Sequence, residues 1–441
     1  MTGMLLRNCM KFLYEGLIMR RITNKIKENK TILENLSYMT FLQIFLLVYP
    51  LITYPYLVRV LGKELYGVVL TAQMLASYAS LLIDFGSNFV CAKHVSINRD
   101  NKLMLSVILS NVLFVRFIIF LIIFIIYAAI AYFVSAYKPY FWLFVLTYGF
   151  TTNDLLFPQF FFQGIEKMKF ITLVSISTKV VMVALIFLLV KSKEEVLFVP
   201  IIYSFGFLIG GIISLFIIYR MGIRMVKPRI KDSLFYLKDS SSIFLTDVVC
   251  SIKDKLSYLM VGTLVGMSDV VIYDLGQKLH GIAAKPYTLI CTVLFPRFAK
   301  DRDLSLLKRV ALLNFSVTLT VVIVANVFLD DISYFFIHEH TNLLPLRLFL
   351  LGPIVLSVSY VLSNNLFVAF GYNRYMFYSI LATTVIYFIS LAIALFYGCL
   401  NNIMSFVCIA LISYVAELIY RLYLSRNIYK NENLRKIDNG Q

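Results

Sequence analysis

Charged residues are scarce in this sequence of 441 residues, in which Asp, Glu, Lys and Arg together make up 15%. Water-soluble domains usually carry about 25% of these residues. Hydrophobic residues make up 60%, and the mean hydropathy is +0.83. A chain with so little charge cannot cover a water-exposed surface, which excludes a soluble enzyme and indicates an integral membrane protein.

Motifs that mark common catalytic and metal sites are also lacking. The six cysteines are widely separated and show neither the spacing of zinc ligands nor a disulfide framework. The four histidines form no His-Glu-x-x-His pattern, and the chain has no phosphate-binding Gly-x-x-x-x-Gly-Lys loop. No nucleophile stands beside a partnered base. We therefore expect no enzymatic activity, no metal and no cofactor.

Long apolar runs fill most of the chain, and each is long enough to cross a bilayer as a helix of about 20 residues. They lack the alternation of apolar and polar residues that the strands of a membrane β-barrel show. The sequence predicts an all-α integral membrane protein with twelve transmembrane helices at approximately 36–58, 66–91, 105–134, 140–162, 170–190, 196–219, 242–266, 271–296, 311–329, 346–370, 376–398 and 402–424.

The longest predicted loop divides these helices into two groups of six. We expect two six-helix lobes around a central cavity: an N-terminal segment at 1–35, an N-lobe at 36–219, an inter-lobe loop at 220–241, a C-lobe at 242–424 and a tail at 425–441.

Basic residues are distributed unequally between the two sets of loops. Of the 41 Lys and Arg residues, 29 lie on the side shared by the N-terminus and 6 on the other, outer side. Because basic loops stay in the cytoplasm, both termini and the inter-lobe loop are predicted to be cytoplasmic. The net charge of +17 follows this topology and forms no basic aromatic module, which argues against nucleic-acid binding.

The first 18 residues are mildly apolar and precede Met19, Arg20 and Arg21. They lack the apolar core and small-residue cleavage site of a signal peptide. Two alternatives stay open: an amphipathic segment at the membrane interface, or a translation start at Met19.

Four segments carry a resemblance to a known family. They read PYLVRVLG at 55–62, KELYGVVLTAQMLASYASLLIDFGSNF at 63–89, FQGIEKMKF at 162–170 and LGPIVLSVSYVLSNNLFV at 351–368. The chain resembles, from about Thr31 onward, polysaccharide flippases of the Wzx type, in the multidrug, oligosaccharidyl-lipid and polysaccharide exporter superfamily. An internal echo, YLVRVLG at 56–62 and YLMVGTLVG at 258–266, predicts a helix, a glycine turn and a second helix in each half.

The resemblance implies a flippase that moves undecaprenyl-pyrophosphate-linked oligosaccharide units of O-antigen or capsule across the bacterial inner membrane by alternating access. The partners it implies are this glycolipid and the bilayer, with an O-unit polymerase and a chain-length regulator as further candidates. Two alternatives in the superfamily are a multidrug antiporter and the flippase of the lipid-linked peptidoglycan precursor.

Charges inside the predicted spans are the strongest functional signal, because each costs roughly 2.5–3.5 kcal/mol at the bilayer centre. Asp274, Lys278 and Lys285 are separated by 4 and 7 residues and so share one face of the eighth span. In the seventh span, Lys253 and Lys255 point about 200° apart, and Lys255 lies nearer the acidic face of that helix.

The first, second, seventh and eighth helices line the cavity in the superfamily that this chain resembles. The resemblance therefore implies a substrate-binding set of Arg59, Asp84, Lys255, Lys278 and Lys285. Asp247 and Asp254 are candidates for ion coupling. The alternative is that these charges pair for structural reasons. Asp274 with Lys278, and Glu417 with Arg421, have the i,i+4 spacing for this, while Arg116 and Lys179 lie in the third and fifth helices.

Overall fold

The structure, a computed structural model, describes the backbone of residues 2–438 and the side chains of residues 34–429 except 250, 254 and 427. The first group of helices forms the N-lobe: α1 (Thr2–Asp84), α2 (Ser87–Ile97), α3 (Lys102–Phe133), α4 (Phe141–Thr147), α5 (Thr152–Leu156), α6 (Gln159–Gly164), α7 (Met168–Leu189) and α8 (Phe198–Arg220). The rest of the chain forms α9 (Ile230–Met260), α10 (Met267–Asp301), α11 (Leu304–Val327), α12 (Leu329–Ile337), α13 (Leu344–Tyr360), α14 (Asn373–Phe396) and α15 (Ile403–Asp438).

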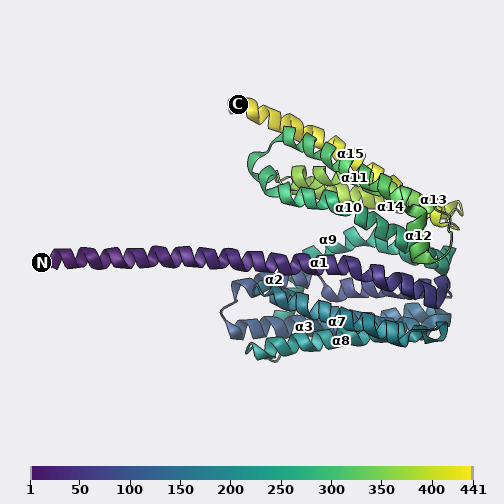
Figure 1. Cartoon of the computed structure of the whole chain (residues 1–441), viewed down its shortest axis with the longest axis horizontal. Helices are drawn as coiled ribbons and strands as arrows, with labels where there is room; N and C mark the ends of the chain where they lie inside the picture. The colour runs from purple at the N-terminus through teal and green to yellow at the C-terminus, as the bar shows by residue number, and fades with distance from the viewer. Residues whose placement is uncertain (1, 439–441) are drawn as a thin grey trace.

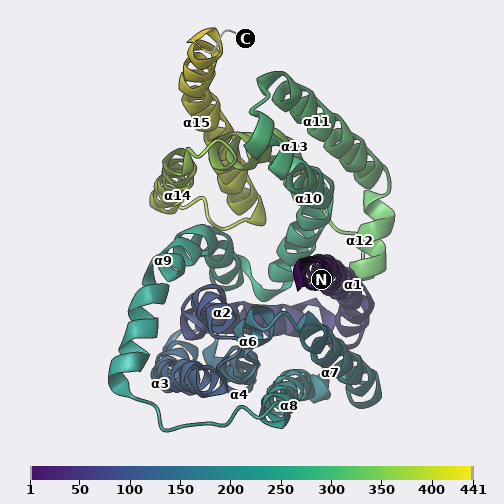
Figure 2. The same ribbon diagram turned by 90° about the vertical axis from the view of Figure 1, so that its left-hand side faces the viewer.

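The two lobes are visible as two groups of helices. Helices α10–α15 form the C-lobe, and α9 passes from one group to the other (Figure 2). The lobes lie close together at the end that contains α12 and diverge toward the end at which both termini lie (Figure 1). We call these the closed end and the open end. Both termini are thus on one side, as the loop charges predict.

Glycine turns at the closed end reverse the chain in both halves. Gly62 has φ 78°, and the rings of Tyr54 and Tyr66 on either side of it are 5.0 Å apart. A continuous helix would separate residues twelve positions apart by about 18 Å along its axis, so α1 folds back here into two crossings. Gly266 plays the same part between α9 and α10, with Tyr258 and Tyr273 rings 5.2 Å apart. The predicted echo is therefore a pair of glycine-turned hairpins.

Helices occupy all twelve predicted ranges, and 8 helices of the described residues are long and apolar enough to cross a membrane by length and composition. The first of these, Glu34–Ile97, contains both arms of the Gly62 hairpin. Three predicted spans are not among these 8 helices, and the sequence of each explains why. Spans 242–266 and 271–296 carry several charges, and span 140–162 consists of short helical pieces interrupted at Pro158. The observed architecture is an all-α membrane fold.

The predicted inter-lobe loop is partly helical, because α9 already begins at Ile230. Its start presents Ser233, Tyr236 and Ser240 as a buried face, at helical spacing. The segment before it is held by polar side chains of α3. The backbone N–H groups of Arg224 and Val226 donate to the hydroxyls of Ser106 and Ser110 at 3.2 and 2.9 Å.

The buried apolar residues explain why the lobes meet at one end. One cluster combines N-lobe residues such as Leu61 and Val69 with Val261 and Leu275 from α10 and the turn before it. Two further clusters do not span both lobes: one, around Phe161, uses N-lobe helices and the start of α9, and the other, around Phe367, uses the C-lobe. The shared core therefore stabilises the closed end, whereas the lobes pack separately elsewhere.

Candidate functional site

The closed end is sealed by close backbone packing between the two glycine-turned hairpins. A Cβ atom on Gly67 would lie 1.7 Å from the carbonyl oxygen of Met267, so only glycine fits this contact. The hydroxyl of Tyr54 donates to the carbonyl oxygen of Val271 at 2.6 Å. Small residues commonly permit such approaches between membrane helices. A substrate entering between the lobes at the open end would meet this seam as a barrier.

The polar stripe of α10 begins at this seam and continues away from it. Asp274 is buried and accepts hydrogen bonds from Tyr258 and Lys278. The ammonium of Lys278 also lies 4.6 Å from the centre of the Tyr54 ring, so it faces the N-lobe. Lys285, two turns further along, is exposed and has no ion-pair partner among the side chains that the structure describes. The predicted i,i+4 pair is thus present, and Lys285 lies outside it.

The two lysines of α9 face different lobes, as their spacing predicts. Lys255 reaches the N-lobe, where its Nζ donates to the carbonyl oxygen of Ser77 at 3.0 Å and lies 5.5 Å from the Tyr78 ring centre. Lys253 faces the C-lobe, with its Nζ 4.0 Å from Glu417. Helix α9 stays regular through both residues. The charged seventh span therefore contributes one cation to each lobe.

Arg59 lies at the closed end, away from the α10 stripe. Its Nε–H donates to Nε2 of His338 at 3.2 Å, just after α12. The neighbouring Lys63 pairs with Glu339 at 2.6 Å. Both contacts join the Gly62 hairpin of the N-lobe to the C-lobe. In this conformation Arg59 belongs to the contact that closes one end.

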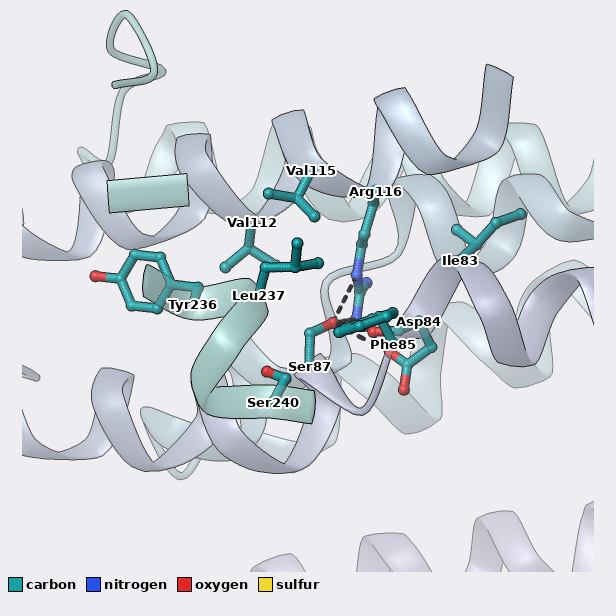
Figure 3. A pocket seen from close by; sticks show the side chains of 10 residues that line it. All are labelled: Ile83, Asp84, Phe85, Ser87, Val112, Val115, Arg116, Tyr236, Leu237 and Ser240. Carbon is teal, nitrogen blue, oxygen red and sulfur yellow. Dashed lines mark hydrogen bonds and ion pairs between the residues drawn. The ribbon is translucent and has the colours of Figure 1, made fainter. Parts of the chain in front are cut away.

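Asp84 ends the second arm of α1 and pairs with Arg116 of α3 at 2.5 Å. The Arg116 side chain is 1% exposed and also donates to the hydroxyl of Ser87 and to the carbonyl oxygen of Asp154. Figure 3 shows the guanidinium pointing toward Ser87 and Asp84, beside a cavity of only about 10 Å³. This volume is at the lower limit for one water molecule. Asp84 and Arg116 are 32 residues apart, so no local sequence pattern indicated this pair.

The candidate ion-coupling residues lie on α9. Asp247 is exposed, whereas the side chain of Asp254 lies outside the described residues. Among the described residues, no group of three or more His, Cys, Asp or Glu side chains has an arrangement that could hold a metal ion. Lys179 of α7 packs over the Phe207 ring of α8 at 5.0 Å, within the N-lobe.

Two hollows lie along α10. The first is a groove of about 540 Å³ beside α1, α10 and the start of α7. Leu36, Met39, Met168 and Leu289 give it a mostly apolar surface, and Asn35, Thr40, Gln43 and Glu166 also line it. Leu289 lies one turn beyond Lys285 on the same face of α10. The second is a polar cavity of about 350 Å³ inside the C-lobe, to which Lys253 contributes. Lysine side chains, an apolar groove and a polar cavity therefore all lie close to α10.

Solved structures share this architecture at low sequence identity. The lipid II flippase MurJ in an inward closed conformation matches with a TM-score of 0.61 and 14% identity, over 88% of this chain and 87% of that one. An inward-facing multidrug resistance transporter of the MATE family, in the MOP superfamily, matches with a TM-score of 0.64 and 13% identity, over 87% and 96% of the two chains. These likenesses establish the two-lobe transporter fold.

Sequence relatives are more specific. A candidate O-antigen transporter of Escherichia coli (strain K12) is 26% identical over 300 residues, which are 67% of this chain and 71% of that protein. A candidate O-antigen transporter of Shigella dysenteriae is 26% identical over 257 residues, or 57% and 63% of the two chains. Residues 32–301 match the family described as polysaccharide biosynthesis protein. This match covers more than half of the chain, which therefore belongs to the polysaccharide biosynthesis protein family.

Proposed function

We propose that this protein is a flippase that moves an undecaprenyl-pyrophosphate-linked oligosaccharide unit of O-antigen or capsule across the bacterial inner membrane. The family and the relatives support the coarser statement, a polysaccharide or O-antigen transporter of the MOP superfamily. The finer proposal is carried by one observation: Lys285 is an exposed cation with no described ion-pair partner, in the middle of α10, a helix that packs against α1 of the N-lobe.

Anion transfer through the bilayer is the physical problem that this arrangement addresses. A pyrophosphate in a low-dielectric region is strongly disfavoured, and a fixed cation nearby offsets that cost. Lys278 and Lys285 share the α10 stripe, and Lys255 faces the same inter-lobe region from α9. The charge of Lys278 is partly neutralised by its ion pair with Asp274. Lys285 has no described ion-pair partner, so its full charge is available to a substrate. We propose that these three lysines carry the pyrophosphate.

The polyprenyl tail of the substrate requires an apolar path outside the polar cavity. The groove along α1 and α10 has apolar lining that includes Leu36 and Leu289, and Leu289 lies one turn beyond Lys285. We propose that the polyprenyl chain lies along this groove while the headgroup faces the lysines. Rocking of the lobes would then open the seam at Gly67 and Met267 and close the opposite end, which is alternating access.

Arg59 and Asp84 take part less directly in this proposal. The contacts of Arg59 with His338 and of Lys63 with Glu339 would separate when the closed end opens. Asp84 would orient Arg116 at the break between α1 and α2. Asp247, exposed on α9, stays a candidate for ion coupling.

The test is surface polysaccharide in cells that lack their own copy of the gene. At equal protein level, Lys285→Gln is expected to reduce surface polysaccharide about tenfold, equivalent to roughly 1.4 kcal/mol of lost stabilisation. Lys285→Arg should retain most of the export because it keeps the positive charge. Lys300→Gln, an exposed position on the same helix, is the matched control. Normal export by Lys285→Gln, or equal losses in Lys285→Gln and Lys300→Gln, would contradict the proposed role.

A further inference from the structure

The polar cavity of the C-lobe is separate from the α10 stripe. It is lined by residues of α9, α10, α13 and the turn that continues it, α14 and α15. Its volume is about 350 Å³, within the range of about 300–1,000 Å³ that small-molecule pockets occupy. Three aromatic rings and polar side chains line it together with one lysine: Lys253, Gln277, His280, Tyr287, Tyr360 and Tyr414. An aromatic and hydrogen-bonding lining of this kind suits a polar ring with apolar faces.

One side of the cavity is a satisfied ion pair. Glu417 of α15 accepts from Arg421 at 2.6 Å and from the hydroxyls of Ser359 and Thr383 at 3.2 and 3.3 Å. Arg421 also donates to the carbonyl and hydroxyl oxygens of Ser359 and to the hydroxyl of Ser379. The charge of Glu417 is therefore already balanced, and its oxygens have hydrogen-bond donors.

Lys253 adds a second cation to this balanced pair. Its side chain is only 14% exposed, and its ammonium lies 4.0 Å from Glu417, beyond the usual hydrogen-bond distance of 2.7–3.2 Å. It lies 5.4 Å from the centre of the Tyr414 ring. Among the described side chains no acceptor lies within hydrogen-bond distance of it. The N–H donors of this ammonium are therefore available to acceptors that an occupant of the cavity supplies.

We propose that this cavity binds a sugar that carries a carboxylate group, with the carboxylate on Lys253 and the ring against the tyrosines. The charged side chains that line the cavity, two cations and one carboxylate, leave a net charge of +1. This matches a monoanionic carboxylate better than a dianionic phosphate. The inference rests on the proposed function, since it names the class of glycan that the flippase carries: one containing an acidic sugar.

Binding of free monosaccharides to the full-length protein in lipid nanodiscs tests the cavity without requiring transport. Saturation-transfer NMR and titration would compare glucuronate with glucose, which lacks the carboxylate, and with acetate, which lacks the ring. We expect glucuronate to bind at least tenfold more tightly than either. Lys253→Gln should weaken glucuronate binding about tenfold, and Lys253→Arg should keep most of it. Lys300→Gln removes the same charge from an exposed position of α10 outside the cavity lining and should leave glucuronate binding unchanged.

Three results would overturn the proposal: glucose binding as well as glucuronate, acetate binding as well as glucuronate, or Lys253→Gln binding glucuronate like the wild type. A thermal unfolding curve of Lys253→Gln that matches the wild type shows that any loss is not misfolding. If glucuronate binds but lipid-linked units are not moved, the flippase proposal fails and the site stands. If units are moved and glucuronate does not bind, the site fails and the flippase proposal stands.

Discussion

Each lobe buries an arginine, and the two lobes surround it differently. In the N-lobe, Arg116 is 1% exposed and its donors meet Asp84, Ser87, Asn88 and the Asp154 carbonyl, beside a cavity of about 10 Å³. In the C-lobe, the pair of Arg421 and Glu417 borders a cavity of about 350 Å³. One cluster has no room for a ligand, and the other does.

The two arginine clusters also differ in their number of cations. The C-lobe adds Lys253 beside a pair that is already balanced, whereas in the N-lobe Arg116 has Asp84 as its ion-pair partner. Charges that satisfy each other stabilise a fold only weakly, but removing one partner is costly. The comparison therefore predicts that the N-lobe cluster serves the fold, while part of the C-lobe cluster serves binding. The following substitutions test this ranking.

The largest effect is expected for Arg116→Met, which leaves Asp84 without its buried partner. Loss of one member of a buried pair costs about 3–5 kcal/mol. Thermal unfolding of the purified protein in detergent should show a clear decrease in Tm, and the double variant Arg116→Met, Asp84→Asn should recover part of it. An unchanged Tm in the single variant would show that the N-lobe cluster does not hold the break between α1 and α2.

A smaller loss of stability is expected for Arg421→Met, although this arginine is also buried. Lys253 lies 4.0 Å from Glu417 and can take over the carboxylate with a small side-chain movement. We expect a cost of about 1–3 kcal/mol, nearer that of a lost hydrogen-bond set than of an orphaned charge. Adding Lys253→Met to this variant should raise the cost further. Equal Tm values for the single and double variants would rule out this compensation.

Lys253→Met alone should change stability by less than about 1 kcal/mol, because the pair of Glu417 and Arg421 remains intact. Its predicted loss is instead in glucuronate binding. A decrease in Tm as large as that of Arg116→Met would mean that Lys253 is a structural residue, and the contrast between the lobes would be lost.

The smallest effect is expected at the pair of Lys63 and Glu339, which joins the lobes at the closed end. The Glu339 side chain is 66% exposed, and such pairs contribute about 0.2–1 kcal/mol. The charge swap Lys63→Glu, Glu339→Lys should behave like the wild type, while either single change should slightly favour opening of this end. Cross-linking of cysteines placed across the closed end, at low and high salt, would measure how often this end opens. A charge swap that fails to restore wild-type cross-linking would contradict the pairing.

Much of this fold follows from local sequence. Apolar runs predicted the helix ranges, and i,i+4 spacing predicted the pairs of Asp274 with Lys278 and of Glu417 with Arg421, both of which are present. The opposite directions of Lys253 and Lys255 also followed from helical geometry.

Contacts between distant helices could not be predicted in this way. The pair of Asp84 and Arg116 joins residues 32 positions apart, and nothing in the spacing indicates which helices are neighbours. The C-lobe cavity combines residues from Lys253 to Arg421 for the same reason. The sequence favoured Lys255 from the acidic face of α9, and this choice stays a prediction. It could not indicate that Lys253 borders a C-lobe cavity, because the position of α15 is not visible in the sequence.

Transbilayer movement of a labelled undecaprenyl-pyrophosphate oligosaccharide in proteoliposomes tests the central claim most directly. Accessibility of the glycan to a membrane-impermeant glycosidase reports how fast it crosses. The wild-type protein should accelerate crossing over protein-free liposomes, and Lys285→Gln should slow this about tenfold, as one lost charge interaction of roughly 1.4 kcal/mol implies. Crossing at the protein-free rate with the wild-type protein, or at the wild-type rate with Lys285→Gln, would contradict the account.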